Sequence, residues 1–342
     1  MSEAPRPLLT EEEQRQKEDR LAALMQCFRE GACVLLVGAG ASEAVGFCSW
    51  TALIRRLEDA AELWNPGFVR DPHVFEADSE RRTLYIGELK NHIRVTYADL
   101  TPYFELLYEL FGRPNPPLSP LHEALAHLPV RSFATTNFDG TLERALLAAW
   151  RMDSDICVDA RNPSRRALGD YMYELVTRGE VRRVLHLHGT YRHPHGIVLG
   201  ADDYREAYGR FSRLPRDNSG PHDGEIGDVL VGLMSSYRFL FVGYSLSDPD
   251  WNQVMAVAAR NTGHLGTLRH FAILPISEDN GALARAKARE LLIEQGVGAI
   301  FYEQDGDDHS ALLPLLQELS DRPRSIVSRV NELMMDGLVH EA

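Results

Sequence analysis

The chain has 342 residues, 44% of them hydrophobic and 25% charged, with a formal net charge of −14 at pH 7. Its length allows one large α/β domain with insertions or two domains, and the acidic balance excludes broad binding to nucleic acid or anionic membranes. No apolar run approaches the ~20 residues that span a bilayer, and the polar N-terminus resembles neither a signal nor a transit peptide. The four cysteines form no C-x-x-C pair, which argues against a zinc ribbon and against a disulfide framework. We therefore expect a cytoplasmic protein.

Strands and helices are predicted to alternate along most of the chain. A polar tail and one helix precede the first strand, and a helical insertion occupies about residues 65–120, ending in a proline-rich loop. The predicted strands are 33–37, 132–135, 184–187, 197–200, 239–242, 270–274 and 298–301. The predicted helices between and after them are about 50–63, 122–128, 142–150, 204–211, 228–237, 251–257, 282–295 and 312–335. This alternation predicts an α/β fold with a doubly wound parallel sheet.

A glycine turn follows the first strand, with the sequence Gly38-Ala39-Gly40-Ala41-Ser42. Such a turn brings backbone N–H groups up to a phosphate, and a Cβ at either glycine would hold the ligand off or forbid the backbone angles. The positive end of the following helix favours a diphosphate. The third glycine of the dinucleotide fingerprint G-x-G-x-x-G is replaced by Glu43, so a simple strand–helix connection is the alternative.

Three more polar or glycine-containing motifs follow predicted strands. They are Asn137–Asp139, His188–Gly189 and Gly243–Leu246. Because the carboxyl ends of parallel strands meet at one edge of an open sheet, where ligands bind, we expect all four motifs to form one site.

These motifs, read as G-A-G-A-S, T-T-N-F-D, H-L-H-G and V-G-Y-S-L-S-D-P, resemble the sirtuin NAD-binding domain. The closest resemblance is to the sirtuin-like domains of bacterial anti-phage defence systems, over roughly residues 30–275. It implies a Rossmann-like fold that hydrolyses NAD+ to ADP-ribose and nicotinamide. Two departures favour the hydrolase over a protein deacylase: the zinc ribbon is missing, and residues 45–50 replace the sirtuin segment G-I-P-D-F-R.

The resemblance divides the chain into three parts. These are an N-terminal tail and helix (1–30), a sirtuin-like Rossmann domain (31–280) that contains the insertion, and a C-terminal helical extension packed on the core (281–342).

Two side chains are the catalytic candidates. His188 is expected to act as general base on the ribose hydroxyls or the attacking water, and the alternative is a histidine bonded to backbone. Asn137 is expected to bind the ribose or fix the water, and the alternative is a turn-forming asparagine. His186 lies two residues before His188 and is interpreted as structural support.

The remaining site residues are expected to bind the substrate. Ser42 and the amides of residues 39–41 would bind the diphosphate, and Ser245 with the Gly243 backbone would meet the adenosine ribose or phosphate. By resemblance Asp139 contacts the nicotinamide amide, and the alternative is a helix cap. The full set of binding candidates is Gly38, Ala39, Gly40, Ser42, Thr136, Asp139, Gly243, Ser245 and Leu246. Asp248 and Asp250 are interpreted as helix caps, and no metal is expected.

The resulting hypothesis is an NAD+ glycohydrolase that serves as the effector of an anti-phage, abortive-infection system. A freely active enzyme of this kind would kill its host, so gating by homo-oligomerisation or by a partner is expected. By resemblance the partner is a HerA-type ATPase or an Argonaute-like protein. The alternatives are a sirtuin-type deacylase or ADP-ribosyltransferase, and a non-catalytic module that binds NAD or ADP-ribose. The loop G-x-x-x-x-G-K-[ST] does not occur, which argues against ATP hydrolysis.

Overall fold

A computed structural model gives the structure, and it describes residues 8–94, 99–162, 164, 166–178, 181–214, 225–263, 265–306 and 308–321. Within these residues a seven-stranded sheet has the order β3-β4-β2-β1-β5-β6-β7, and every neighbouring pair is parallel. The strands are β1 (Cys33–Val37), β2 (Ser132–Thr135), β3 (Cys157–Asp159), β4 (Val184–His186), β5 (Arg238–Val242), β6 (His270–Ile276) and β7 (Val297–Glu303). The predicted α/β class with a doubly wound parallel sheet is confirmed.

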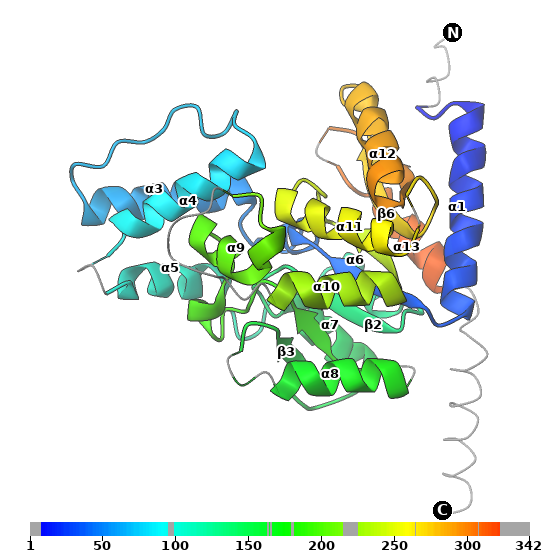
Figure 1. Ribbon diagram of the computed structural model, residues 1–342, viewed down its shortest axis with the longest axis horizontal. Coiled ribbons are helices and arrows are strands. Elements are labelled where there is room, and N and C mark those ends of the chain that lie inside the picture. The colour runs from blue at the N-terminus through cyan, green and yellow to red at the C-terminus, as the bar shows by residue number, and fades with distance from the viewer. Residues whose placement is uncertain are drawn as a thin grey trace, which may run out of the picture.

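Helices cover both faces of this sheet (Figure 1). Before β4 they are α1 (Glu11–Arg29), α2 (Ala39–Glu43), α3 (Trp50–Trp64), α4 (Ser79–His92), α5 (Thr101–Phe111), α6 (Pro120–Ala126), α7 (Thr141–Trp150) and α8 (Arg166–Thr177). After β4 they are η1 (Pro194–Gly196), α9 (Ala201–Tyr208), η2 (Gly209–Phe211), α10 (Glu225–Ser236), α11 (Pro249–Asn261), α12 (Gly281–Gln295) and α13 (Leu312–Ser320). None of these helices is long and apolar enough to cross a bilayer.

Strand β1 lies at the centre of the sheet because all five of its residues are apolar. Val34 and Leu36 face a core that also contains side chains of α8, α9, α10, α11 and α12. Leu35 and Val37 face the opposite core, which is closed by α1, α6, α7 and α13. The period of two along a strand therefore divides one short apolar run between two layers.

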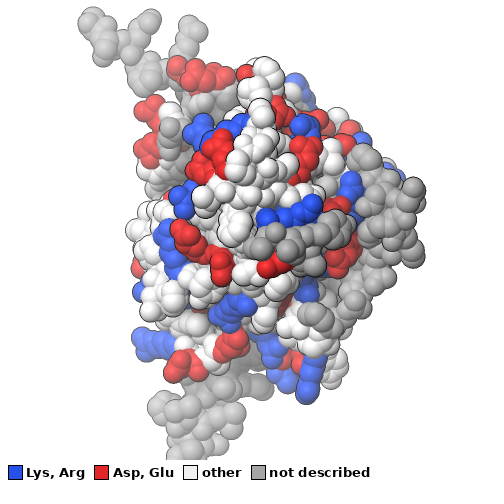
Figure 2. All heavy atoms as spheres, turned by 90° about the vertical axis from the view of Figure 1, so that its left-hand side faces the viewer, with Lys and Arg blue, Asp and Glu red and all other residues white. Residues whose placement is uncertain are grey.

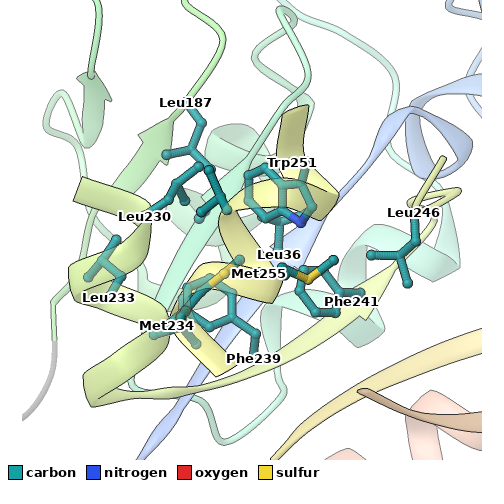
Figure 3. Packing of buried hydrophobic residues seen from close by; sticks show 14 of the residues in the cluster. Leu36, Leu187, Leu230, Leu233, Met234, Phe239, Phe241, Leu246, Trp251 and Met255 are labelled. Atoms are coloured by element: carbon teal, nitrogen blue, oxygen red, sulfur yellow. The ribbon is translucent and has the colours of Figure 1, made fainter. Parts of the chain in front are cut away.

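Trp251 of α11 is a fully buried anchor of the first of these cores. Its ring meets the ring of Phe241 edge-on at 6.2 Å between centroids, and it packs above Leu36 (Figure 3). An aromatic pair of this geometry contributes beyond its buried area. Trp251 therefore belongs to the core and is not available to stack on a ligand.

The helical insertion shares a core with α3, which precedes it: side chains of α3, α4 and α5 pack together with Phe138 and Leu199. It lies beyond the end of the sheet, at the left of Figure 1. Lys90 of α4 forms an ion pair of 2.8 Å with Asp203 of α9, and this contact joins the insertion to the main body. On the face shown in Figure 2, basic and acidic side chains are interspersed, so this view presents no broad basic surface.

Four local predictions differ from the structure. Residues 197–200 form no strand: they run extended and buried, and Val198 donates to the carbonyl oxygen of His188 (2.9 Å), but no ladder forms. The edge strand β3 and helix α8 were not predicted; the three residues of β3 are too few to carry a periodic pattern. The glycine turn begins a five-residue helix, α2, before the helix predicted from about residue 50. The last predicted helix ends at Ser320 in the described part, and its remainder, like residues 215–224, lies outside the described residues.

The first prediction concerns the central strand. Leu36→Ala should lower the free energy of unfolding by about 2–5 kcal/mol, because Leu36 is fully buried and its truncation leaves a cavity. Leu63→Ala is the matched control, since Leu63 is 77% exposed and should change stability by less than about 0.5 kcal/mol. Urea unfolding of both variants measures the difference. Equal losses would contradict this assignment of the core.

Candidate active site

A cavity of about 680 Å³ opens at the carboxyl ends of β1, β2, β4 and β5. The chain passes from β1 to β2 on one side, whereas β5 pairs with β1 on the other, so the cavity lies where the strand order reverses. Nine of the eleven predicted site residues line it. They are Ala39, Gly40, Ser42, Thr136, Asn137, Asp139, His188, Gly243 and Ser245.

The glycine turn is held against the turn that follows β5. A Cβ on Gly38 would lie 2.5 Å from the Gly243 carbonyl oxygen, and the Gly40 N–H donates to that same oxygen at 3.0 Å. The Ala41 N–H donates to the Gly38 carbonyl at 3.2 Å. The glycines thus permit contact between two loops, and the amides of residues 40 and 41 already have acceptors within the protein. In the described part of the chain, the Ala39 amide and the Ser42 hydroxyl remain as donors for a ligand.

Asn137 is held on several sides. Its Nδ2 donates to the Gly38 carbonyl oxygen at 3.1 Å and to Ser42 Oγ at 2.9 Å, and its backbone N–H donates to Thr135 Oγ1 at 3.0 Å. Its Oδ1 is buried and has no protein partner. A buried amide oxygen without a donor is an acceptor prepared for a hydroxyl group or a water molecule.

His186 supports Asn137 from behind, as the sequence suggested. Its Nδ1 lies 3.0 Å from the Asn137 carbonyl oxygen, and its Nε2 lies 2.8 Å from Glu143 Oε1. Burial alone would lower the pKa of His186, but the Glu143 carboxylate and the Cys157 sulfur raise that pKa well above its usual value. Glu143, Cys157 and His186 each bring one ligand atom within 4.8 Å of the others, so these side chains are the described residues suited to bind a metal ion.

His188 is 5% exposed and lies against two tyrosines of α9. Its Nε2 is 2.7 Å from the Tyr208 hydroxyl, and the stacked rings of Tyr204 and Tyr208 meet the imidazole edge-on. Burial, with the Arg161 cation, lowers the pKa of His188 to about 3. The imidazole is therefore neutral at pH 7. Its bond to a side chain replaces the backbone-bonded alternative considered from the sequence.

The carboxylates at the site accept hydrogen bonds from neighbouring backbone and hydroxyl groups. Asp139 is buried and accepts from the Thr141 N–H at 2.9 Å, so one of its oxygens supports the first turn of α7. Asp248 caps α11 by accepting from the backbone of Asp250 and Trp251, as predicted. Burial raises the pKa of Asp248 to about 6, and its Oδ2 accepts from the Tyr204 hydroxyl at 2.9 Å. The interpretation of Asp250 as a helix cap is wrong, because Asp250 lies within the first turn of α11 and accepts from Ser212 Oγ and the Arg213 N–H.

The loop after β5 places its residues differently. Ser245 is exposed, bonds to the Ser247 hydroxyl at 2.7 Å, and accepts from Lys287 of α12 through its carbonyl oxygen. The side chain of Leu246 is 1% exposed and points into the core (Figure 3), and its backbone φ of +51° is unusual for leucine. Leu246 can therefore meet a ligand only through its backbone, and its side chain fixes the loop.

Several cavity residues were not predicted. Arg82 and Phe111 of the insertion line it, as do Phe47 before the insertion and Lys287, Tyr302 and His309 near the C-terminal end of the described chain. The sequence could have indicated Tyr204, which lines the cavity, and Tyr208, which bonds to His188, because a spacing of four places both on one face of the predicted helix. No local signal marks the insertion residues, since only tertiary packing brings them to the sheet.

Comparisons with known proteins agree with this architecture. A family model described as a SIR2-like domain matches residues 131–300. The chain is 22% identical over 247 residues to the NAD(+) hydrolase ThsA of Bacillus cereus (strain MSX-D12), covering 71% of this chain and 43% of that protein. It is 25% identical over 240 residues to the ThsA of Cytobacillus dafuensis, covering 70% and 40%. It is 24% identical over 251 residues to the ThsA of Acinetobacter baumannii (strain 532279), covering 72% and 42%. The resemblance expected from the four motifs is confirmed, and the chain spans less than half the length of these relatives.

The contact between the two turns predicts the effect of enlarging Gly38. Gly38→Ala should lower the free energy of unfolding by about 1–3 kcal/mol, because its Cβ would collide with the Gly243 backbone. Gly232→Ala in α10 is the matched control: nothing lies within 4 Å of its Cβ, and alanine should stabilise the helix by about 0.5–1 kcal/mol. Thermal and urea unfolding measure both. A neutral Gly38→Ala would contradict the described contact.

The lowered pKa of His188 predicts a pH dependence of stability. The imidazole of the unfolded chain takes up a proton near pH 6.5, whereas the folded imidazole does so only near pH 3. As the pH falls between these values the unfolded state binds more protons, so this group removes stability. His188→Gln should therefore lose less stability than the wild type between pH 6.5 and 4, measured by urea unfolding at each pH. Parallel losses in both proteins would show that His188 titrates normally.

Proposed function

We propose that this chain, which carries a SIR2-like domain, is an NAD+ glycohydrolase that cleaves NAD+ to ADP-ribose and nicotinamide. The observation that supports it is the shared cavity, lined by nine of the residues expected to bind or cleave NAD+. The names of the ThsA relatives, NAD(+) hydrolases, support the same reaction.

Hydrolysis of the glycosidic bond of NAD+ requires few catalytic groups from the protein. Water adds to C1′ of the nicotinamide ribose, the glycosidic C–N bond breaks, and the bonding electrons stay with nicotinamide, which leaves as a neutral molecule. The remaining proton of the water passes to solvent. The site therefore has to hold the ribose, orient the water and stabilise an oxocarbenium-like transition state. Asn137 Oδ1, buried without a partner, is suited to accept from a ribose hydroxyl or from the attacking water.

His188 acts in this proposal as a neutral imidazole that bonds to the ribose hydroxyls or to the water. Its pKa near 3 makes it a weak base in the ligand-free protein. A weak base is sufficient, because the oxocarbenium-like carbon is a strong electrophile. The Tyr208 hydroxyl bonds to Nε2 of His188 and fixes the orientation of the ring. The other ring nitrogen, Nδ1, is then the atom that bonds to the ribose hydroxyls or to the water.

The other site residues are proposed to bind the rest of NAD+. Ser42 and the Ala39 amide take the diphosphate, and Ser245 with the Gly243 backbone meets the adenosine. Asp139 has one oxygen engaged by Thr141, and we propose that its other oxygen contacts the nicotinamide amide. Thr136 and Gly40 shape the wall of the cavity, and Gly38 and Leu246 hold its two loops. The reaction as written requires no metal.

The biological role is also part of this proposal. We infer a cytoplasmic effector of anti-phage defence, gated by homo-oligomerisation or by a partner such as a HerA-type ATPase or an Argonaute-like protein. The division into 1–30, 31–280 and 281–342 stays a prediction, with the third part offered for contacts between subunits. Strand β7 of that part pairs with β6, which ties any movement there to the sheet.

The test is consumption of NAD+ by the purified chain, with nicotinamide and ADP-ribose quantified together. His188→Ala and Asn137→Ala should each reduce kcat by at least ~100-fold, because each removes a group that contacts the reacting ribose or water. His127→Ala is the control, since His127 is exposed and outside the cavity.

Each outcome of this assay distinguishes between the proposed function and one alternative. Equal loss of NAD+ in the wild type and both variants would contradict the assigned roles. Binding of NAD+ without turnover, even with the neighbouring operon product added, would favour the non-catalytic module. Release of nicotinamide only when an acylated peptide is present would favour the deacylase.

A further inference from the structure

Two buried residues behind the cavity are unused by the proposed reaction. We propose that Glu143 and His186 are positioning residues, which set the place of Asn137 by holding its backbone carbonyl oxygen. This inference rests on the proposed function and adds two residues to it. Neither side chain lines the cavity, so both would act through Asn137.

The geometry connects three separate elements. Glu143 belongs to α7, His186 ends β4, and Asn137 lies in the loop between β2 and α7. The imidazole spans the gap, with Nδ1 3.0 Å from the Asn137 carbonyl oxygen and Nε2 2.8 Å from Glu143 Oε1. The exposed fraction is 0% for His186 and 4% for Glu143, so water does not compete for these bonds.

The charges explain how one ring serves both acceptors. A neutral imidazole has one N–H, whereas both nitrogens here face acceptors, so the double donation needs the protonated ring. Glu143 Oε1 lies 2.8 Å from Nε2 and faces that nitrogen directly.

Stability by itself does not account for this pair. Glu143 Oε2 is buried without a partner, and a buried ion pair with an unsatisfied oxygen is commonly no more stable than apolar side chains of similar volume. We infer instead that the pair fixes the orientation of Asn137. With the carbonyl held by His186 and Nδ2 held by Gly38 and Ser42, Oδ1 is left as the polar atom of Asn137 for the substrate. Small displacements of such a group reduce rate strongly.

The decisive variant replaces the whole pair with apolar residues, Glu143→Leu together with His186→Phe. The double substitution avoids leaving either charge buried alone, which would threaten folding. We expect its unfolding midpoint to equal or exceed the wild type, whereas kcat for NAD+ falls at least ~10-fold and KM changes less than ~3-fold. Assays contain EDTA, because Cys157 beside the pair completes a set of metal-binding side chains.

Two further variants separate positioning from stability. Glu143→Gln should keep most of kcat, because its amide can turn to donate to Nε2 while the Nδ1–H still holds Asn137. His270→Phe removes another buried histidine, at the amino end of β6, and should lower stability without lowering kcat.

The inference is overturned if the double variant folds and keeps wild-type kcat, or if kcat in all variants simply follows the unfolding midpoint. A crystal structure of the double variant gives a readout that needs no turnover. We expect the contact of 2.9 Å between Asn137 Nδ2 and Ser42 Oγ to lengthen or break, and an unmoved Asn137 would refute the role. A wild type that neither binds nor cleaves NAD+ would refute the proposed function, and the position of Asn137 would still decide this inference.

Discussion

The close approach of two turns determines the shape of this site. The Gly38 N–H donates to the Val242 carbonyl at 2.9 Å, the Gly40 N–H donates to the Gly243 carbonyl at 3.0 Å, and no Cβ fits between them. Because β1 and β5 are neighbours at the centre of the sheet, this contact closes one wall of the cavity. The carbonyl of Gly38 then receives Asn137 Nδ2, which brings in the loop after β2. A glycine contact between two backbones thus positions a polar side chain on a third strand.

Two histidines of one strand end have opposite electrostatic surroundings. His186 faces the Glu143 carboxylate and is held charged, whereas His188 faces tyrosines and the Arg161 cation and is held neutral. Both are buried, so the difference comes from the neighbouring charge and not from solvent. The charged ring is directed at backbone and carboxylate, and the neutral ring lies at the cavity. Two histidines only two residues apart in the sequence therefore have different roles: His186 supports the structure, and His188 is the catalytic candidate.

The insertion and α9 give the cavity its outer wall. The α4–α9 ion pair joins the insertion to the helix whose tyrosines contact His188 and Asp248. This side of the cavity therefore depends on a part of the chain that is remote from the four motifs.

The amino-acid sequence by itself determined the parallel sheet and the meeting of its strand ends. Alternating apolar runs and turn residues are local signals, and parallel strands share one edge, so Ser42, Asn137 and His188 could be assigned to one site in advance. The sequence also indicated that Asp248 caps a helix, because helix capping depends only on the three residues that follow the cap. Only the tertiary structure decided the partners of these groups. Glu143 appears as an ordinary acidic residue of a helix, and its contact with His186 spans 43 positions. The run at 197–200 is apolar enough for a strand, but a strand requires a neighbour in the ladder. Gly38 faces the backbone of residue 243, and no pattern within the first turn specifies a contact so distant in the chain.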